Sequence, residues 1–266
     1  MKNLVLCLLL SGSAFAGEKT AATVETASPW SGSLAAGWDS LYMFRGVNQL
    51  PGPGGYGSGI SWTALSMAWS PTEQDSFAAS TWVAFGTNQT DYKEVDVTSS
   101  YTRSLGDLSL SAGYALYAVL SEPGGLYSNE IYVSAAYEFR FGAITITPTL
   151  NYTFTLGPPP GDGGYIDPGA GYLELRIDAE IPLYRNVVSA TPWVASGFNF
   201  GYNSTDADVP ETFDDADHLE MGLALPIALT SSITLSPYVA YSHTWLPLLG
   251  TRRDTFWGGA SITFSF

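Results

Sequence analysis

Residues 254–266 read DTFWGGASITFSF and alternate strictly between two kinds of side chain. From Phe256 to Phe266 every second residue is a large apolar residue, a glycine or an alanine, and the residues between them are mostly Thr and Ser. Residues 144–155 repeat this pattern, with threonine and asparagine on the polar face. A period of two predicts a β-strand whose two faces meet different surroundings.

The same alternation continues along most of the chain, in about twelve segments separated by clusters rich in Gly, Pro, Asn and Asp. Connections after even-numbered segments are short, such as 105–106 and 141–142, and those after odd-numbered segments are longer, such as 157–170. This alternation of short turns and long loops is typical of antiparallel barrels that span an outer membrane. The expected strands are 32–46, 58–70, 76–87, 93–104, 107–119, 129–141, 143–156, 171–182, 186–200, 217–229, 232–245 and 254–266.

The composition points the same way. Apolar residues make up 45% of the chain and charged residues only 13%, whereas a water-facing surface usually carries about 25–35% charged residues. With 10 Lys and Arg against 25 Asp and Glu, the net charge of -15 would repel nucleic acid. We therefore expect an all-β fold, a transmembrane antiparallel up-and-down β-barrel of about 12 strands with short periplasmic turns and longer extracellular loops. A soluble secreted β protein, either a sandwich or a barrel, is the alternative fold.

The first residues predict export. Lys2 precedes the short apolar run 4–10, and Ala14-Phe15-Ala16 forms a small-x-small cleavage site, so residues 1–16 are expected to be a signal peptide cleaved after Ala16. The single cysteine, Cys7, lies inside it. Residues 17–30 are expected to be a flexible periplasmic segment and residues 31–266 the barrel, located in the cell outer membrane.

Residues 38–49, WDSLYMFRGVNQ, resemble the early strand signature of the TorF-type porin family. Tyr42, Phe44, Arg45 and Gly46 carry the resemblance, although the acidic residue stands at Asp39 and not directly before the tyrosine. The resemblance implies a Gram-negative outer-membrane barrel with a porin-like role and names no solute. The terminal strand ending in Phe266 is similar to that of outer-membrane barrels generally, where this end is recognised by the barrel-assembly machinery.

If the apolar face meets lipid, the other face lines the lumen. Acidic residues predominate there, which would raise the local concentration of cations and give a weakly cation-preferring channel. The alternative is that the carboxylates pair with the arginines and fill the barrel. The candidate pore-lining residues are Asp39, Arg45, Glu94, Asp96, Glu130, Tyr132, Glu138, Arg140, Glu174, Arg176, Asp178, Glu180 and Glu220.

Aromatic residues on the polar face either fill the barrel or stack on rings of sugars or nucleobases. The second role would make the protein a channel selective for nucleosides or small sugars. The predicted inward aromatics are Trp69, Trp82, Tyr117, Tyr132, Tyr172, Trp193, Tyr238 and Trp257.

The sequence thus predicts a porin-like channel for passive diffusion of small hydrophilic solutes, which contacts outer-membrane lipid and lipopolysaccharide. One alternative is a plugged barrel that acts as a structural or adhesion protein through its extracellular loops. Another is an outer-membrane lipolytic enzyme using the outward-facing His243, but no serine shares its face. We expect no catalytic residue, metal site or cofactor, and we interpret the acidic stretch 206–217 as a solvated loop.

Overall fold

The computed structural model describes residues 28–50, 57–88, 91–121, 126–157, 169–185, 187–201, 214–245 and 254–266. The expected signal peptide 1–16, and nearly all of the segment 17–30, lie outside these ranges. Within them, no helix is long and apolar enough to cross a membrane.

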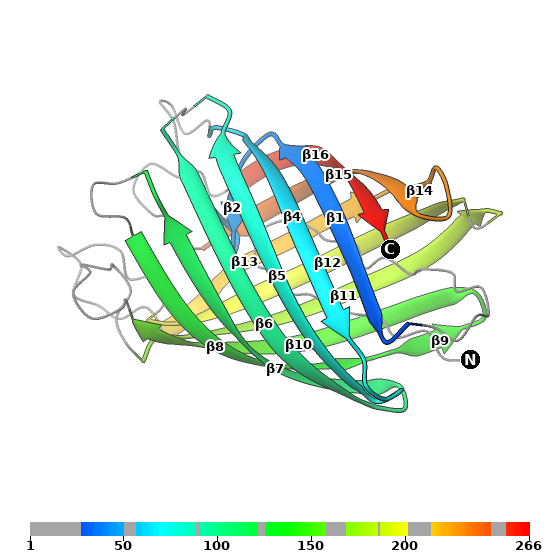
Figure 1. Ribbon diagram of the computed structural model, residues 1–266. Helices are drawn as coiled ribbons and strands as arrows, with labels where there is room; N and C mark the ends of the chain where they lie inside the picture. Colours follow the sequence, from blue (N-terminus) through cyan, green and yellow to red (C-terminus); the bar gives the residue numbers. More distant parts are fainter. Residues whose placement is uncertain are drawn as a thin grey trace.

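Twelve long antiparallel strands close into a barrel (Figure 1), which confirms the predicted fold class. Each long strand pairs with its neighbours in the sequence, and β1 closes the barrel by pairing with β16. The strands of the wall are β1 (Trp30–Asp39), β4 (Ile60–Trp69), β5 (Asp75–Gly86), β6 (Lys93–Leu105), β7 (Leu108–Val119), β8 (Leu126–Tyr137), β10 (Ile144–Gly157), β11 (Gly171–Tyr184), β12 (Val188–Phe200), β13 (Asp214–Ala224), β15 (Ile233–Thr244) and β16 (Asp254–Ser265).

The apolar face of the strands points outward. On β16, Phe256 is 77% exposed and Phe264 is 47% exposed, while Trp257 and Thr263 between them are buried. On β10, Leu150 is exposed and Thr155 is completely buried. A protein folded in water would show the reverse arrangement, so this exterior is suited to lipid.

Four aromatic rings form a row on the outside at the short-turn end. Trp30, Trp69, Phe77 and Tyr101 are successive register partners across β1, β4, β5 and β6, and their adjacent ring centroids lie 6.2, 5.6 and 5.0 Å apart. Such rings are typical of the membrane interface. The prediction that Trp69 points inward is wrong, because β4 carries apolar residues on both faces and its alternation does not identify the lipid side.

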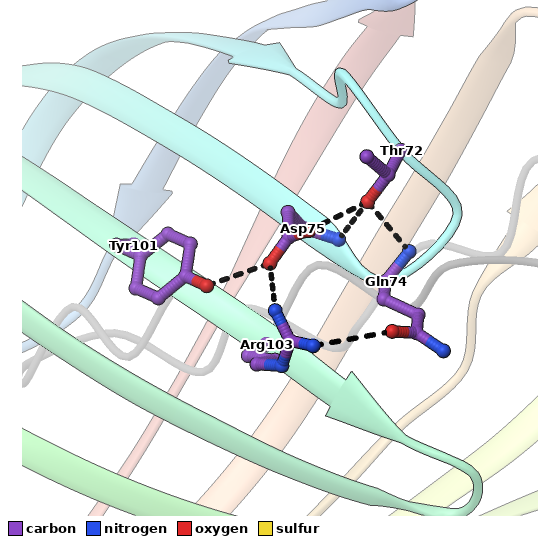
Figure 2. Close-up of polar contacts among 5 residues, drawn as sticks. All are labelled: Thr72, Gln74, Asp75, Tyr101 and Arg103. Carbon is purple, nitrogen blue, oxygen red and sulfur yellow. Dashed lines mark hydrogen bonds and ion pairs between the residues drawn. The ribbon is translucent and has the colours of Figure 1, made fainter.

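The turn below this row is fixed by polar contacts (Figure 2). Asp75 accepts hydrogen bonds from the hydroxyl of Tyr101 at 2.6 Å, from Arg103 at 3.0 Å and from the hydroxyl of Thr72 at 2.7 Å. The Thr72 oxygen in turn accepts from the backbone amides of Gln74 and Asp75. Arg103 therefore binds the protein's own turn at this end of the barrel.

The first strand is shorter than the sequence predicts. β1 ends at Asp39, and the chain then forms a small hairpin of β2 (Met43–Phe44) and β3 (Val47–Asn48), a separate two-stranded sheet. The predicted strand 32–46 is therefore wrong beyond residue 39. Two short strands continue the wall at the short-turn end: β9 (Phe139–Phe141) and β14 (Ile227–Ala228).

Candidate functional site

The β2–β3 hairpin turns at Arg45 and Gly46, which have φ values of 50° and 74°. Phe44 and Val47 pair on either side, so this is a two-residue hairpin turn with both central residues in the left-handed region. An arginine in this region costs roughly 1–3 kcal/mol. Position 46 also has no room for a side chain, because a Cβ added to Gly46 would lie 2.1 Å from Cγ of His218.

The side chain of Arg45 connects the hairpin to the barrel wall through a buried ion pair. Its Nη1 and Nη2 donate to the two carboxylate oxygens of Glu130 on β8 at 3.1 and 2.9 Å, and both side chains are almost fully buried. The guanidinium also lies over the rings of Tyr172, at 4.6 Å, and Phe44, at 4.9 Å. A buried bidentate pair of this kind fixes both distance and orientation, which offsets the strain at the turn.

Contacts with other strands place the hairpin inside the barrel (Figure 1). The hydroxyl of Ser242 on β15 donates to the carbonyl oxygen of Gly46 at 3.3 Å. Tyr172 on β11 and His218 on β13 share a hydrogen bond of 3.0 Å, and their rings are nearly parallel. The hairpin therefore contacts β8, β13 and β15 at once and narrows the half of the barrel nearer the long loops.

Asp39, the last residue of β1, lies beside the hairpin and is buried. Its carboxylate accepts hydrogen bonds from the indole of Trp62 at 2.8 Å and from the hydroxyl of Tyr238 at 2.7 Å. Trp62 was not among the predicted inward aromatics, because β4 carries apolar residues on both faces and its alternation does not show which face points inward.

A second acidic group lies on β6. Glu94 and Asp96 are both buried on its inner face, and the hydroxyl of Tyr92, just before the strand, donates to Glu94. Burial and the neighbouring Glu94 carboxylate raise the pKa of Tyr92, so its phenol stays neutral and acts as a donor. Tyr42 packs beside Tyr92 and Trp82, with 5.8 Å between ring centroids in each case.

A third group lies further toward the short turns, on β11 and its neighbours. Arg176 binds Asp178 through Nε at 2.9 Å and Nη2 at 2.8 Å, and its guanidinium lies 5.3 Å from the Trp193 ring. The Trp193 indole donates to Glu220 at 3.0 Å. Two more predicted carboxylates share the inner face of β11: Glu174 and Glu180.

Of the remaining predicted pore-lining residues, one lies on the inner face of the barrel and two lie at its rim. Tyr132 is half-buried and its ring packs over Gly113 on the inner face. Glu138 and Arg140 lie at the short-turn rim, where the exposed Arg140 pairs with Glu138 and, at 3.5 Å, with Asp107. Their expected place within the bore is therefore wrong, because the strand is interrupted at Glu138, between β8 and β9.

The acidic stretch 206–217 falls largely outside the described residues. Its last member, Asp217, is completely buried next to His218 in β13 and is no part of a solvated loop. In the described part of the chain, no group of three His, Cys, Asp or Glu side chains is arranged to hold a metal ion. His218 was not among the predicted site residues, although it shares a face of the predicted strand 217–229 with the inward candidate Glu220, and this register is the signal that could have identified it.

His243 faces outward, as expected, at the long-loop end. Its Nδ1 lies 2.9 Å from the carboxylate of Asp254, and its ring meets the edge of Trp245. Its partners in register, Leu219 on β13 and Asp254 on β16, offer no nucleophilic hydroxyl. This arrangement suits an interfacial histidine and does not support a lipolytic triad.

No family model and no curated protein matches the sequence. Several solved structures share the fold. The COG4313 outer membrane channel from Pseudomonas putida F1 superposes with a TM-score of 0.56 and 11% identity over 91% of this chain and 97% of that chain. The NanC porin gives 0.54 and 11% over 88% and 98%, and the KdgM porin 0.51 and 11% over 88% and 99%.

At this level of identity the similarity concerns the fold. The chain has the architecture of porin-type barrels of the outer membrane, and these neighbours are channels and porins, not enzymes.

Proposed function

We propose that the protein is an outer-membrane channel for passive diffusion of small hydrophilic solutes with a weak preference for cations. One observation carries the proposal: inside the described barrel, carboxylates outnumber guanidinium groups. Arg45 and Arg176 each form an ion pair with one acid, Glu130 and Asp178. The inward acids beyond these pairs are Asp39, Glu94, Asp96, Glu174, Glu180 and Glu220.

A narrow bore with low-dielectric walls concentrates the field of such charges. Cations are attracted into it and anions are repelled. The hairpin strengthens this effect because it narrows the outer half of the barrel beside Asp39 and Glu94. A solved structure describes the KdgM porin in complex with disordered oligogalacturonate. A polyanion of that kind would be repelled by the acidic interior proposed here.

The remaining sequence predictions complete the proposal. Export by cleavage after Ala16, kinship with the TorF-type porins, and recognition of the strand ending in Phe266 by the barrel-assembly machinery are all consistent with a porin-type fold. Membrane lipid and lipopolysaccharide would surround the exposed apolar face.

The test is the reversal potential of the purified, refolded protein in a planar bilayer under a KCl gradient. The expected sign is that of potassium preference, and the double variant Glu174→Gln/Glu220→Gln should reduce it. Glu73→Gln, an exposed acid in the turn before β5, serves as the control and should leave it unchanged. Chloride preference in the wild-type protein would overturn the proposed selectivity.

A second candidate function is favoured by the hairpin itself. If the hairpin closes the barrel, the protein acts through its long loops as a structural or adhesion protein. A correctly folded barrel that inserts into bilayers but passes no current would exclude the channel and favour this alternative.

A further inference from the structure

His218 on β13 lies between the turn of the hairpin and the barrel wall. A Cβ added to Gly46 in the turn would lie 2.1 Å from Cγ of His218, and a Cβ added to Gly197 on β12 would lie 2.8 Å from its Cε1. Glycine on both sides leaves room for the imidazole, and the residue is only 1% exposed. The ring therefore fills the space between hairpin and wall, so a change in its charge acts on both.

The imidazole and the guanidinium of Arg45 share one neighbour. The hydroxyl of Tyr172 lies 3.0 Å from Nδ1 of His218, in a hydrogen bond. The Arg45 guanidinium lies 4.6 Å from the centroid of the same tyrosine ring. An arginine is always charged, whereas a histidine becomes charged only in acid. In acid, two positive side chains would therefore contact one tyrosine.

The carboxylates around His218 belong to the wall, and the cation belongs to the hairpin. The next cation along the wall, Arg176, is paired with Asp178. The neighbours on β12 and β15 are the uncharged residues Gly197, Ser242 and Thr244. A positive charge on His218 would therefore be attracted by the wall and repelled by the hairpin. The charged and titratable groups that surround it are Arg45 of the hairpin, Glu130 on β8, Tyr172 and Glu174 on β11, and Asp217 and Glu220 on β13.

We propose that His218 makes the hairpin an acid-sensitive gate. A proton on its imidazole places a second cation beside Arg45, releases the turn from the wall and widens the half of the bore nearer the long loops. A proton on Glu130 acts in the same direction, because it removes the partner of Arg45, but a histidine ordinarily gains its proton at a higher pH than a carboxylate does. The gate rests on the channel function proposed above and adds a regulation to it.

Single-channel recording of the full-length, refolded protein from about pH 8 to about pH 4 tests the gate. We expect the potassium conductance to rise in acid, whereas protonation of the carboxylates in the lumen would by itself lower it. His218→Gln keeps a polar side chain of similar size without the titratable ring, and should lose the rise. His243→Gln is the matched control, because it makes the same change at the other histidine of the chain, which lies on the outside, and it should keep the rise.

Heat-dependent mobility on a gel checks that each variant is folded, and Tyr172→Phe decides the matter if His218→Gln does not fold. This variant removes the hydroxyl bonded to His218 and keeps the ring. Loss of one hydrogen bond should move the pH midpoint of the rise by about 0.4–1 unit, and an unmoved midpoint would overturn the gate.

The other outcomes separate the gate from the channel. A wild-type conductance that does not rise in acid would overturn the gate and leave the channel function intact. A rise that persists in folded His218→Gln would assign the effect to carboxylates and overturn the role of His218. Absence of current at every pH would overturn both proposals, whereas a current that appears only in acid and depends on His218 would support the gate.

Discussion

Arg45 combines an unfavourable backbone with a favourable side chain. Its φ of 50° belongs to a region that glycine and asparagine adopt more readily. Its guanidinium reaches Glu130, which is 85 residues away in the sequence and on another strand of the barrel. Because the backbone of Arg45 is strained while its side chain forms a buried ion pair, we infer that arginine occupies this position for the ion pair and not for the geometry of the turn.

Arg45→Asn separates these two contributions. Asparagine suits the turn, but it removes the cation that faces Glu130, and breaking one side of a buried ion pair costs roughly 3–5 kcal/mol. We expect a lower urea midpoint for the refolded barrel and a larger, noisier single-channel current as the hairpin loosens.

The double variant Arg45→Asn/Glu130→Gln should recover part of this loss, because it removes the uncompensated carboxylate as well. The two residues should therefore couple by about 0.5–3 kcal/mol in a double-mutant cycle. Additive effects of the two substitutions would show that the ion pair does not hold the hairpin.

At the scale of elements, the hairpin is joined to the wall by side-chain contacts and not by a β-ladder. β2 and β3 form their own sheet, and among the described residues no barrel strand pairs with them in a ladder. The wall itself pairs continuously from β1 through β16. The hairpin can therefore change without breaking the barrel.

Replacing residues 42–48 by a short Gly/Ser linker should leave a folded barrel with a higher conductance. Heat-dependent mobility on a gel checks the folding, and single-channel recording checks the conductance. A folded variant with unchanged conductance would mean that the hairpin does not limit the flow of ions.

The difference between wall and hairpin also explains what the sequence could predict. Strand positions such as 143–156 and 254–266 were predicted closely, because lipid on one side imposes strict alternation. The hairpin was missed because the apolar run from Leu41 to Phe44 was interpreted as a continuation of the first strand, and because the residue that holds Arg45 is distant in the sequence. The acids at Asp39, Glu94 and Glu130 could be assigned to the inner face by register. The alternation within one strand does not show that Glu130 on β8 is the acid that binds Arg45.

The whole molecule separates its apolar residues from its charges. Exposed aliphatic and aromatic residues cover the outside, and the inward carboxylates account for part of the net charge of -15. The electrostatic field of the inward carboxylates is screened by the ions of the surrounding salt solution, so its strength depends on the ionic strength.

Ionic strength should therefore control the cation preference of the channel. The Debye length falls from about 30 Å at 0.01 M salt to about 3 Å at 1 M, so the carboxylates act together across the bore only in dilute salt. Reversal potentials measured at a fixed concentration ratio should show strong potassium preference at low salt and almost none at 1 M. A preference that persists at 1 M would point to direct contact of each ion with individual carboxylates, because contacts of that kind are screened much less than the summed field of the barrel.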